Sequence, residues 1–407
     1  MYPTVYHALL DLFGWDIPVL KLLNSFGFFV AMGFIVGGRI IYSEFKRQEE
    51  EGLLKSEKQK IIIGKPVNWQ DVVYNTLIGF ILGWKFIYLF KNASVLFQPG
   101  SLPQEHIFSL EGYPLIGILS AVILGGYNWY VQNKEALPEP IEKVVDYHKY
   151  EYTGTLVMVA AISGIAGAKL FHLFENPTQF MEFFREPSIE NFISGLTIYG
   201  GLIIGGIVTI WYMRKKGFPA LHLIDAAAPA LILSYGIGRV GCQVSGDGDW
   251  GIANAAPKPG WLNWAPDWMW SYSFPNNVNG IYGMTSHGYE GKRILESDPW
   301  PIFDGYGTYL YPGVFPTAFY ETMMTLVIFG VLWSLRKKIK IPGMIFAIYL
   351  MFNGLERFFI EKIRVNNVFG FLGMQVTQAE VISTIFFLSG LGMAIWLYKT
   401  KKEAVLS

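Results

Sequence analysis

This sequence has little charge, few histidines and almost no cysteine. Charged residues make up 16% of its 407 residues, whereas soluble proteins carry about 25%. The single cysteine, Cys242, excludes a disulfide scaffold. The 32 basic and 32 acidic residues leave a formal net charge of zero, so we expect no nucleic-acid partner. Hydrophobic residues reach 52% and the mean hydropathy is +0.32. The composition therefore predicts an integral membrane protein.

Nine stretches have the apolarity and roughly the length that a membrane helix needs, about 20 residues. They predict an all-α polytopic membrane protein with about nine transmembrane helices. A buried helix of a soluble core is the alternative for any one stretch, but nine in one chain disfavour it. The predicted spans cover Phe26–Tyr42, Val72–Phe90, Pro114–Val131, Leu156–Phe174, Leu196–Met213, Leu223–Val240, Ala318–Leu335, Met344–Phe359 and Val376–Leu397.

Lysine and arginine gather in alternate gaps between these spans. The gap after the first span holds basic residues at positions 46, 47, 55, 58, 60 and 65, whereas the gap from Asn92 to Tyr113 holds none. The sixth and eighth gaps also contain basic residues, so the alternation is incomplete. Because basic loops stay on the cytoplasmic side, the pattern predicts an N-terminus outside and a cytoplasmic C-terminus.

The spans define a predicted domain layout. Residues 1–25 lack the basic start and the cleavage site of a signal peptide, and we expect an amphipathic segment on the outer interface. Residues 26–241 and 316–398 form the transmembrane helical domain, and residues 399–407 form a cytoplasmic tail. Residues 242–315 hold six tryptophans among many Pro, Gly and Asn, which predicts an outer (periplasmic) head domain at the headgroup level. A sugar-binding or partner-binding surface is the alternative there.

Part of the chain resembles another part at an offset of 84 residues. Gly83–Asn92 has the sequence GWKFIYLFKN, and Gly167–Asn176 has GAKLFHLFEN. At the same offset, Gly117 corresponds to Gly201. The second and third spans therefore look like a copy of the fourth and fifth. Chance similarity between apolar helices is the alternative.

Two charged blocks lie at the outer ends of predicted spans, where ionisable residues are costly and often functional. The block GIGRVGCQVSGDGDWG contains Arg239, followed by two aspartates in a glycine-rich turn. The block NGLERFFIEKIR places Arg357, Glu361 and Arg364 at positions i, i+4 and i+7, which share one face of a helix.

Arg239 and Arg357 at one membrane depth predict a phosphate site, because a guanidinium group binds phosphate oxygens in a bidentate fork. The alternative is that Arg357–Glu361 and Arg239–Asp247 are structural ion pairs. The metal-binding spacings His-x-His and His-Glu-x-x-His are absent, and so is a serine nucleophile elbow. We therefore expect neither a metal nor a cofactor.

At these blocks the chain resembles the prolipoprotein diacylglyceryl transferase family. The family motif GRxGNFxNxExxG is similar to Gly238–Gly251, and the Asp and Pro that precede it match Asp225 and Pro229. The motif FRxxxExxR is similar to the second charged block. HPxxLYE resembles FPTAFYE at residues 315–321, and HGGLIG resembles YGGLIIG at residues 199–205. The four motifs agree in order. The resemblance is good from residue 156 onward except in the head domain, and loose over residues 25–92.

This resemblance implies an activity and a set of partners. It implies transfer of a diacylglyceryl group from phosphatidylglycerol to the lipobox cysteine of prolipoproteins, in the bacterial inner membrane. The partners are phosphatidylglycerol, prolipoprotein signal peptides and membrane lipids, and no cofactor is implied. Family members have seven spans, and the duplicated pair makes nine in the same orientation. The residues implied in catalysis are Tyr199, Arg239, Asp247, Arg357 and Glu361. Those implied in substrate binding are Phe26, Gly200, Gly201, Cys242, Ser245, Gly251, Glu321 and Arg364.

The chain departs from the family motifs at several positions. Tyr199 replaces the histidine of HGG, which is often treated as the catalytic base. Cys242 replaces an asparagine, Asp247 a glutamate, Phe315 a histidine, and Phe26 the tyrosine of the first helix. The arginines remain, whereas the positions that handle protons have changed.

These departures leave alternatives open. Tyr199 is the closest candidate to assist deprotonation of the thiol, with Glu361 and Asp247 in reserve. A second hypothesis is a non-catalytic relative that binds phosphatidylglycerol or a lipidated protein. A third is a transporter, because repeats and intramembrane charges are common in transporters.

Overall fold

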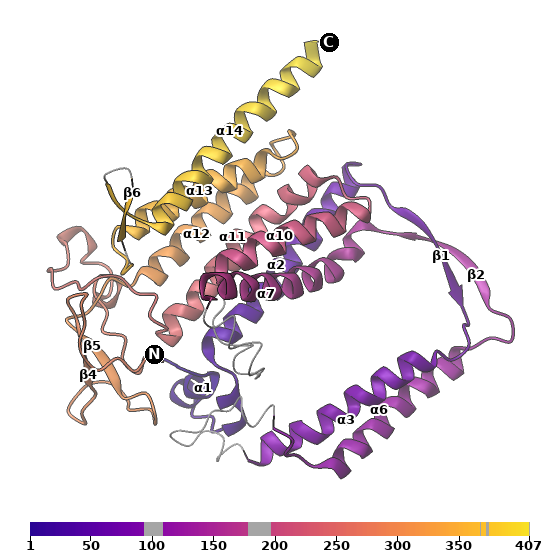
Figure 1. Cartoon of the computed structure of the whole chain (residues 1–407), viewed down its shortest axis with the longest axis horizontal. Coiled ribbons are helices and arrows are strands. Elements are labelled where there is room, and N and C mark those ends of the chain that lie inside the picture. Colours follow the sequence, from indigo (N-terminus) through magenta and orange to yellow (C-terminus); the bar gives the residue numbers. More distant parts are fainter. Residues whose placement is uncertain (93–108, 178–196, 367, 372–373, 407) are drawn as a thin grey trace. The chain divides into compact units, whose positions relative to one another are not determined.

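The computed structural model describes residues 1–92, 109–177, 197–366, 368–371 and 374–406. These residues are mostly helical (Figure 1). The helices are α1 (Val5–Phe13), η1 (Pro18–Leu22), α2 (Ser25–Glu50), α3 (Trp69–Lys91), α6 (Pro114–Glu135), η2 (Lys149–Tyr152), α7 (Thr153–Glu175), α10 (Ile198–Lys215), α11 (Ala220–Ser245), η3 (Gly260–Leu262), η4 (Asp267–Met269), α12 (Thr317–Leu335), α13 (Met344–Glu361) and α14 (Gln378–Leu406).

Short antiparallel strands connect some of the helices. They are β1 (Glu57–Ile63), β2 (Ile141–Tyr147), β3 (Gly283–Met284), β4 (Glu290–Arg293), β5 (Thr308–Tyr311), β6 (Val368–Phe371) and β7 (Met374–Thr377). β1 pairs with β2, β6 pairs with β7, and β3, β4 and β5 form a three-stranded sheet with β4 in the middle.

The chain divides into two compact units. The first comprises residues 1–16, 23–48 and 210–407, and the second comprises residues 17–22 and 49–209. Helix α10 crosses the division.

The predicted spans coincide with helices. Each of the nine stretches overlaps one of α2, α3, α6, α7, α10, α11, α12, α13 and α14, although Leu196 lies outside the described residues. Among the described helices, seven are long and apolar enough to cross a bilayer; α10 and α13 are not among them. Helix α13 carries Glu356, Arg357 and Glu361, and α10 ends in two basic residues. The chain is thus a polytopic helical membrane protein, and the number nine stays a prediction.

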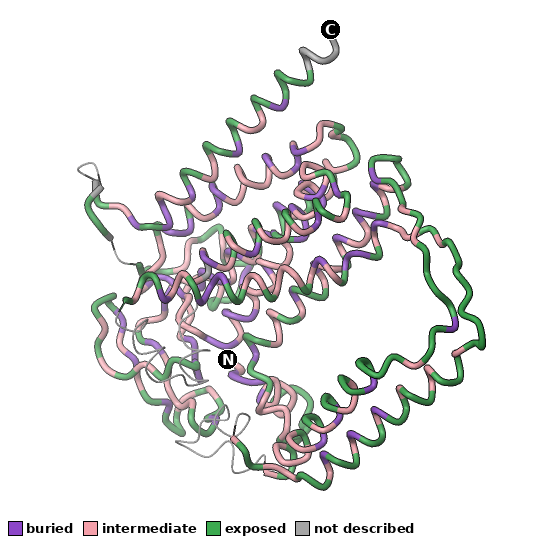
Figure 2. The backbone as a smooth tube through the Cα atoms, turned by 45° about the vertical axis from the view of Figure 1, so that its right-hand side comes forward, coloured by how far each residue is buried: buried purple, intermediate pink, exposed green. Residues whose placement is uncertain are grey.

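Many residues along these helices are exposed (Figure 2), and large apolar ones are among them. Leu77 and Ile81 on α3 are more than half exposed, and so is Leu388 on α14. In water this surface would be unfavourable, whereas lipid acyl chains cover it without cost. The exposure therefore fits helices that face a bilayer.

In the first unit, α11, α12 and α13 pack against one another, and α14 packs along α13. Their contact surface is a fully apolar cluster, which consists of Ala228, Ile232, Ile328, Leu332 and Ile345. Asp225 on α11 accepts hydrogen bonds from the backbone N–H groups of Gly343 (2.6 Å) and Phe346 (2.9 Å). A carboxylate at a helix N-terminus satisfies otherwise unpaired donors, so Asp225 fixes the start of α13 against α11.

Helix α2 approaches α11 closely through small residues. A Cβ atom on Gly33 would lie 3.2 Å from the carbonyl oxygen of Ser234, and one on Gly37 would collide with the Ser234 hydroxyl. That hydroxyl donates to the carbonyl of Gly33 at 2.8 Å. The small-xxx-small spacing therefore marks helix packing here.

In the second unit, the predicted repeat is visible in the packing. A Cβ atom on Gly83 would collide with residues 116 and 120, and one on Gly167 would collide with residues 200 and 204, which lie 84 positions later. The backbone hydrogen bond from Tyr113 to Trp84 recurs from Thr197 to Ala168. Two helix pairs, α3–α6 and α7–α10, therefore share one interface geometry, and chance similarity is disfavoured.

Helix α11 continues to Ser245, so the segment before α12 starts at Gly246 rather than at Cys242. It holds the three-stranded sheet and a small core, which consists of Trp250, Phe274, Tyr289, Leu310 and Val314. Trp261 and Trp264 are exposed. The N-terminal segment packs on it, because the His7 ring lies 4.7 Å from that of Phe303.

Candidate functional site

Charged side chains from three helices meet at one end of the α11–α12–α13 bundle. Arg239 lies in the last two turns of α11, and Arg357 and Glu361 lie in the last two turns of α13. Glu321 lies near the start of α12. Because the chain direction alternates, two helix ends and one helix start share this end of the bundle.

Glu321 joins the three arginines of this site. One of its oxygens, Oε1, lies 3.0 Å from Nη1 of Arg364 and 3.3 Å from Nη1 of Arg357. Its other oxygen pairs with Arg239 and accepts a hydrogen bond from the Tyr235 hydroxyl at 2.8 Å. The Glu321 side chain is fully buried. A buried carboxylate with four donors is a positioning element, because it fixes each donor in one place.

Asp249 supplies a second bridge between arginines. Its two carboxylate oxygens pair with Arg239 and with Arg364. The turn that brings it back to α11 has positive φ angles at Gly246 (65°) and Gly248 (100°). Such angles favour glycine, so the glycine-rich sequence places this carboxylate.

The segment after Asp249 is held in place by residues at the start of α12 and by the segments just before α12 and just after α13. The Thr317 hydroxyl donates to the Asp249 carbonyl at 2.7 Å, and the Gly251 N–H donates to the Phe315 carbonyl at 2.8 Å. A Cβ atom on Gly251 would lie 2.4 Å from the Ile363 carbonyl oxygen. Gly251 is therefore a packing requirement.

The alternative of a structural ion pair between Arg239 and Asp247 was wrong in its acidic partner. The ion pair forms with Asp249, because the two positive-φ glycines turn that side chain toward the arginines. Burial raises the pKa of Asp249, but Arg239 and Arg364 outweigh it and lower the pKa to about 2. The pKa of Asp247 is raised, first by burial and then by the charge of Asp249.

The end of α13 carries the predicted i, i+4 pair. Arg357 Nη2 lies 3.0 Å from Glu361 Oε2, and the Asn366 side chain donates to Glu361 Oε1 at 2.6 Å. The helix ends at Glu361, so Arg364 does not continue its face as predicted. Instead, Arg364 forms an isolated β-bridge with Gly251 and reaches Glu321 from there.

We call this set of residues the arginine cluster. It combines three guanidinium groups with three paired carboxylates: Arg239, Arg357, Arg364, Asp249, Glu321 and Glu361. The formal charges cancel. An anionic phosphate enters such a cluster favourably only if it replaces a carboxylate on the arginines.

Cys242 borders the arginine cluster. Its Sγ lies 3.6 Å from Asp249 Oδ2 and 3.6 Å from Arg239 Nη1. Among the described residues, Cys242, Asp247 and Asp249 offer potential metal ligands within 4.8 Å of one another. Two guanidinium groups already hold Asp249 and would repel a cation, so this donor set does not favour a metal.

Comparison with known proteins identifies the family. Residues 106–396 match the family described as prolipoprotein diacylglyceryl transferase, and this region contains the whole arginine cluster. The chain belongs to this family. A phosphatidylglycerol–prolipoprotein diacylglyceryl transferase of Streptococcus pyogenes serotype M5 is 26% identical over 294 residues, which cover 71% of this chain and 91% of the relative. The protein of the same name from Corynebacterium glutamicum is 26% identical over 251 residues, 60% of this chain and 69% of the relative.

The residues that correspond to the HGG motif of the transferase family lie in the second unit. Tyr199 is half-buried near the start of α10. A Cβ atom on Gly200 would lie 2.5 Å from the Gly167 carbonyl oxygen, and one on Gly201 would lie 3.0 Å from that of Gly164. The observed role of both glycines is close packing of α10 on α7. Their predicted contact with substrate stays a prediction.

The remaining predicted residues lie in the first unit near the arginine cluster. The backbone of Phe26 at the start of α2 packs on Gly241, and its side chain is 43% exposed. Ser245 is buried, and its carbonyl accepts a hydrogen bond from the Val278 N–H at 3.2 Å. Phe315 packs edge to face on Trp270.

Three residues of this region were missed as site residues. Tyr235 precedes Arg239 by one helical turn, and that spacing was a usable signal. Asp249 was seen in the sequence but not assigned, because side-chain spacing does not reveal the shape of a glycine turn. Glu356 directly precedes Arg357 and is buried. The sequence signal that could have identified Glu356 is that it is a third charged residue, beside Arg357 and Glu361, in an otherwise apolar helix.

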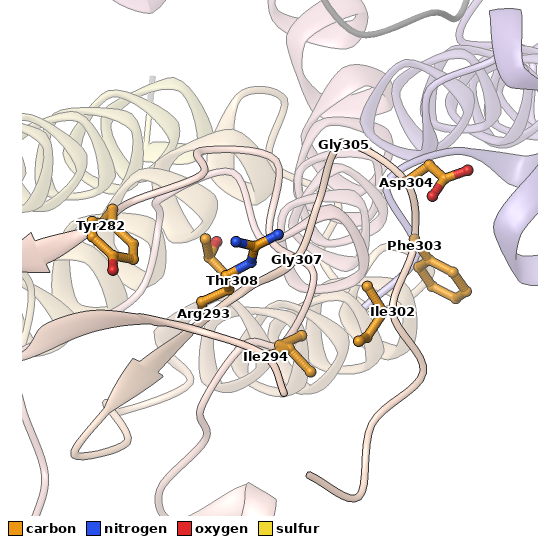
Figure 3. A pocket seen from close by; sticks show the side chains of 9 residues that line it. All are labelled: Tyr282, Arg293, Ile294, Ile302, Phe303, Asp304, Gly305, Gly307 and Thr308. Carbon is orange, nitrogen blue, oxygen red and sulfur yellow. The ribbon is translucent and has the colours of Figure 1, made fainter. Parts of the chain in front are cut away.

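A separate pocket opens in the segment between α11 and α12. It has a volume of about 510 Å³ and is lined by residues of β4, β5 and the loop between them, together with Tyr282. Figure 3 shows the Arg293 guanidinium in its middle, with Tyr282 on one side and Ile302 and Phe303 on the other. No residue of the arginine cluster lines it.

Proposed function

We propose that this protein transfers a diacylglyceryl group from phosphatidylglycerol to the thiol of a lipobox cysteine in prolipoproteins. Family membership supports the reaction class. The observation that carries the proposal is the arginine cluster, in which three guanidinium groups meet at the end of three membrane helices. Such a group is suited to a lipid phosphate and to the charge that develops as it leaves.

In this proposal, Arg239 and Arg357 bind the phosphate of phosphatidylglycerol. Asp249 is the carboxylate that the phosphate replaces, since it sits on a glycine-rich turn and its side chain is 34% exposed, whereas Glu321 and Glu361 are fully buried. Glu321 and Glu361 keep the guanidinium groups oriented during the exchange. Arg364, which Asp249 also holds, becomes a third phosphate ligand.

The thiol has to lose its proton before it attacks, because the thiolate is the nucleophile. The C–S bond then forms at the glycerol carbon, and the C–O bond to phosphate breaks with its electron pair on the phosphate oxygen. Tyr199 is our candidate to assist deprotonation in place of the family histidine. Asp247 and Glu361 remain in reserve for that role.

The same proposal includes the arrangement in the membrane. We place the protein in the bacterial inner membrane with nine spans, the N-terminus outside and the C-terminus in the cytoplasm. Residues 246–316 and the N-terminal segment 1–25 then lie on the outer side, where the arginine cluster also lies. This places the lipid phosphate and the secreted precursor on one side of the membrane.

An in vitro assay with phosphatidylglycerol vesicles and a lipobox peptide tests the activity. We expect Arg239→Ala and Arg357→Ala each to lower the transfer rate by about 100-fold or more, as expected for lost stabilisation of transition-state charge. Arg39→Ala is the matched control, because Arg39 is exposed on α2 and lies over the Tyr42 ring. Full activity of both cluster variants would overturn the assignment.

A non-catalytic relative is the second candidate, and the replacement of the family histidine by Tyr199 favours it. The same assay separates the two functions. A binding protein retains phosphatidylglycerol without forming the thioether product, and it does not restore growth to a strain depleted of its own transferase.

A further inference from the structure

Glu356 is a buried acid without a partner beside the arginine cluster. It lies on α13, directly before Arg357, and is 4% exposed. Both of its carboxyl oxygens are buried, and neither has a hydrogen-bond partner among the residues that the structure describes. A buried carboxylate is normally paired or hydrogen-bonded, so this one needs an explanation.

The charged groups around Glu356 already form ion pairs with one another. Glu356 interacts electrostatically with Glu321 on α12, Arg239 on α11, Arg357 on α13, and Arg364 beyond the end of α13. Those three arginines already pair with Asp249, Glu321 and Glu361. No guanidinium group of the cluster is therefore left over for a fourth carboxylate.

Among the residues that the structure describes, the other ionisable groups near Glu356 do not supply an unpaired positive charge. Tyr235 on α11 and Tyr349 on α13 interact with it and are neutral hydroxyl groups. On α14, which packs along α13, the acidic residue near this end is Glu380, and it pairs with Lys362. An ionised Glu356 would thus be an uncompensated buried charge close to Glu321, which is strongly unfavourable. A protonated carboxyl group at this position avoids that cost.

We propose that Glu356 stores a proton and gives it to the glycerol phosphate that leaves the arginine cluster. This inference rests on the proposed transferase function. A protonated acid beside a site where negative charge develops is the arrangement of a general acid. Glu356 then acts only after the phosphate has gained its second negative charge, and the resting cluster stays neutral.

Atoms and charge are conserved in this step. The S–H bond of the substrate breaks, the C–S bond forms, and the C–O bond to the phosphate breaks with its electron pair on oxygen. Glu356 transfers its proton to that phosphate oxygen and becomes a carboxylate. The proton released by the thiol then returns to Glu356. The products are a thioether and a singly protonated glycerol phosphate.

Difference infrared spectroscopy tests the stored proton without any turnover. The full-length protein in lipid nanodiscs should show the carbonyl stretch of a protonated, non-hydrogen-bonded carboxyl group, and Glu356→Gln should lack it. Glu296→Gln is the control, because the Glu296 side chain is exposed and lies outside the arginine cluster, so it should not contribute to this band. A wild-type spectrum without a band that depends on Glu356 overturns the proposal.

Addition of glycerol phosphate tests the transfer of the proton. The dianion should diminish the Glu356 band, whereas phosphatidylglycerol, a monoanion, should leave it intact. A band that glycerol phosphate does not change overturns the proposal. The infrared result does not depend on the transfer assay. If the wild-type protein shows no transferase activity, the proposed function is refuted, and the infrared spectra still decide whether Glu356 stores a proton.

The rate of transfer gives a second readout. We expect Glu356→Gln, which keeps the size of the side chain, to lower the transfer rate about tenfold or more. The loss should be smallest at acidic pH, where solvent protonates the leaving phosphate. A uniform loss at every pH indicates a structural role and overturns the assignment as an acid, as does an unchanged rate.

Discussion

Arg364 and Glu321 are 43 residues apart in the sequence, yet Nη1 of the arginine lies 3.0 Å from Oε1 of the glutamate. Arg364 stands beyond the end of α13, and Glu321 near the start of α12. The contact therefore closes the arginine cluster across two helices. It also makes Glu321 the residue on which the positions of all three arginines depend.

Glu321→Gln should destabilise the protein strongly. The change removes the only carboxylate that contacts all three guanidinium groups of the described cluster and leaves buried positive charge uncompensated. Loss of one partner from a buried ion pair costs about 3–5 kcal/mol. Thermal unfolding in detergent measures the change, with the exposed Glu296→Gln as the control. Equal midpoints for the two variants would contradict the central role of Glu321.

Asp249 and Asp247 should affect the pH dependence of stability in opposite directions. The pKa of Asp249 is lowered in the folded protein to about 2, so the unfolded state binds its proton first as the pH falls. Its contribution is present above the usual pKa of about 4 and is lost as the pH falls toward 2. The side chain is 34% exposed, so we expect about 1 kcal/mol rather than the full value.

The pKa of Asp247 is raised, so its folded form takes up a proton before the unfolded form does. Its charge therefore costs stability at neutral pH, and stability is recovered as the pH falls through the raised pKa. Asp249→Asn should lower the unfolding midpoint at neutral pH and flatten its decline below pH 4, whereas Asp247→Asn should raise the neutral midpoint. Unfolding curves from pH 3 to 8 measure both. If Asp247→Asn lowered the unfolding midpoint at neutral pH more than Asp249→Asn does, the roles assigned to the two aspartates would be reversed.

The sequence predicted the long apolar helices from local spacing and named every residue of the arginine cluster except Asp249, with Glu321 resting on the family resemblance alone. Apolar runs located each helix, and the i, i+4 rule located Arg357 and Glu361. Local spacing could not identify Asp249 as a partner of the arginines. Its direction is set by two glycines with positive φ and by a hydrogen bond from Thr317, which is 68 residues away.

Two glycines show a further limit of prediction from sequence, because a motif does not distinguish a role in packing from a role in binding. Gly200 and Gly201 stand in a motif that the family resemblance assigned to substrate binding. In the structure they are the residues that let α10 touch α7. The 84-residue repeat is the signal in the sequence for such packing, since Gly201 corresponds to Gly117 in a helix pair without the Tyr-Gly-Gly sequence.

Tyr199→Phe should lower the transfer rate about tenfold or more while membrane insertion stays normal. The change removes only the hydroxyl group, and acid–base residues contribute about 10²–10⁴-fold to rates. The purified variant is assayed from mildly acidic to mildly alkaline pH, with Tyr127→Phe on α6 as a control for the loss of an exposed hydroxyl. Wild-type rates throughout would assign Tyr199 to packing between α7 and α10 and direct the search for the base to Glu361.

A larger side chain in place of glycine at the repeated interface should push helices α3 and α6 apart. A Cβ atom on Gly83 would lie 2.6 Å from the Ile116 carbonyl oxygen and 2.3 Å from the Ser120 hydroxyl, whereas one on Gly126 meets open space. Backbone cannot yield to a side chain at such distances, and overpacking costs about 1–3 kcal/mol. Gly83→Val should therefore lower the thermal midpoint in detergent, and Gly126→Val, the control on α6, should do so much less.

The equivalent change in the second copy, Gly167→Val, should match the effect of Gly83→Val, because its Cβ would lie 2.5 Å from the Gly200 carbonyl oxygen. Tolerance of Gly83→Val together with sensitivity to Gly167→Val would show that only one of the two copies depends on this contact.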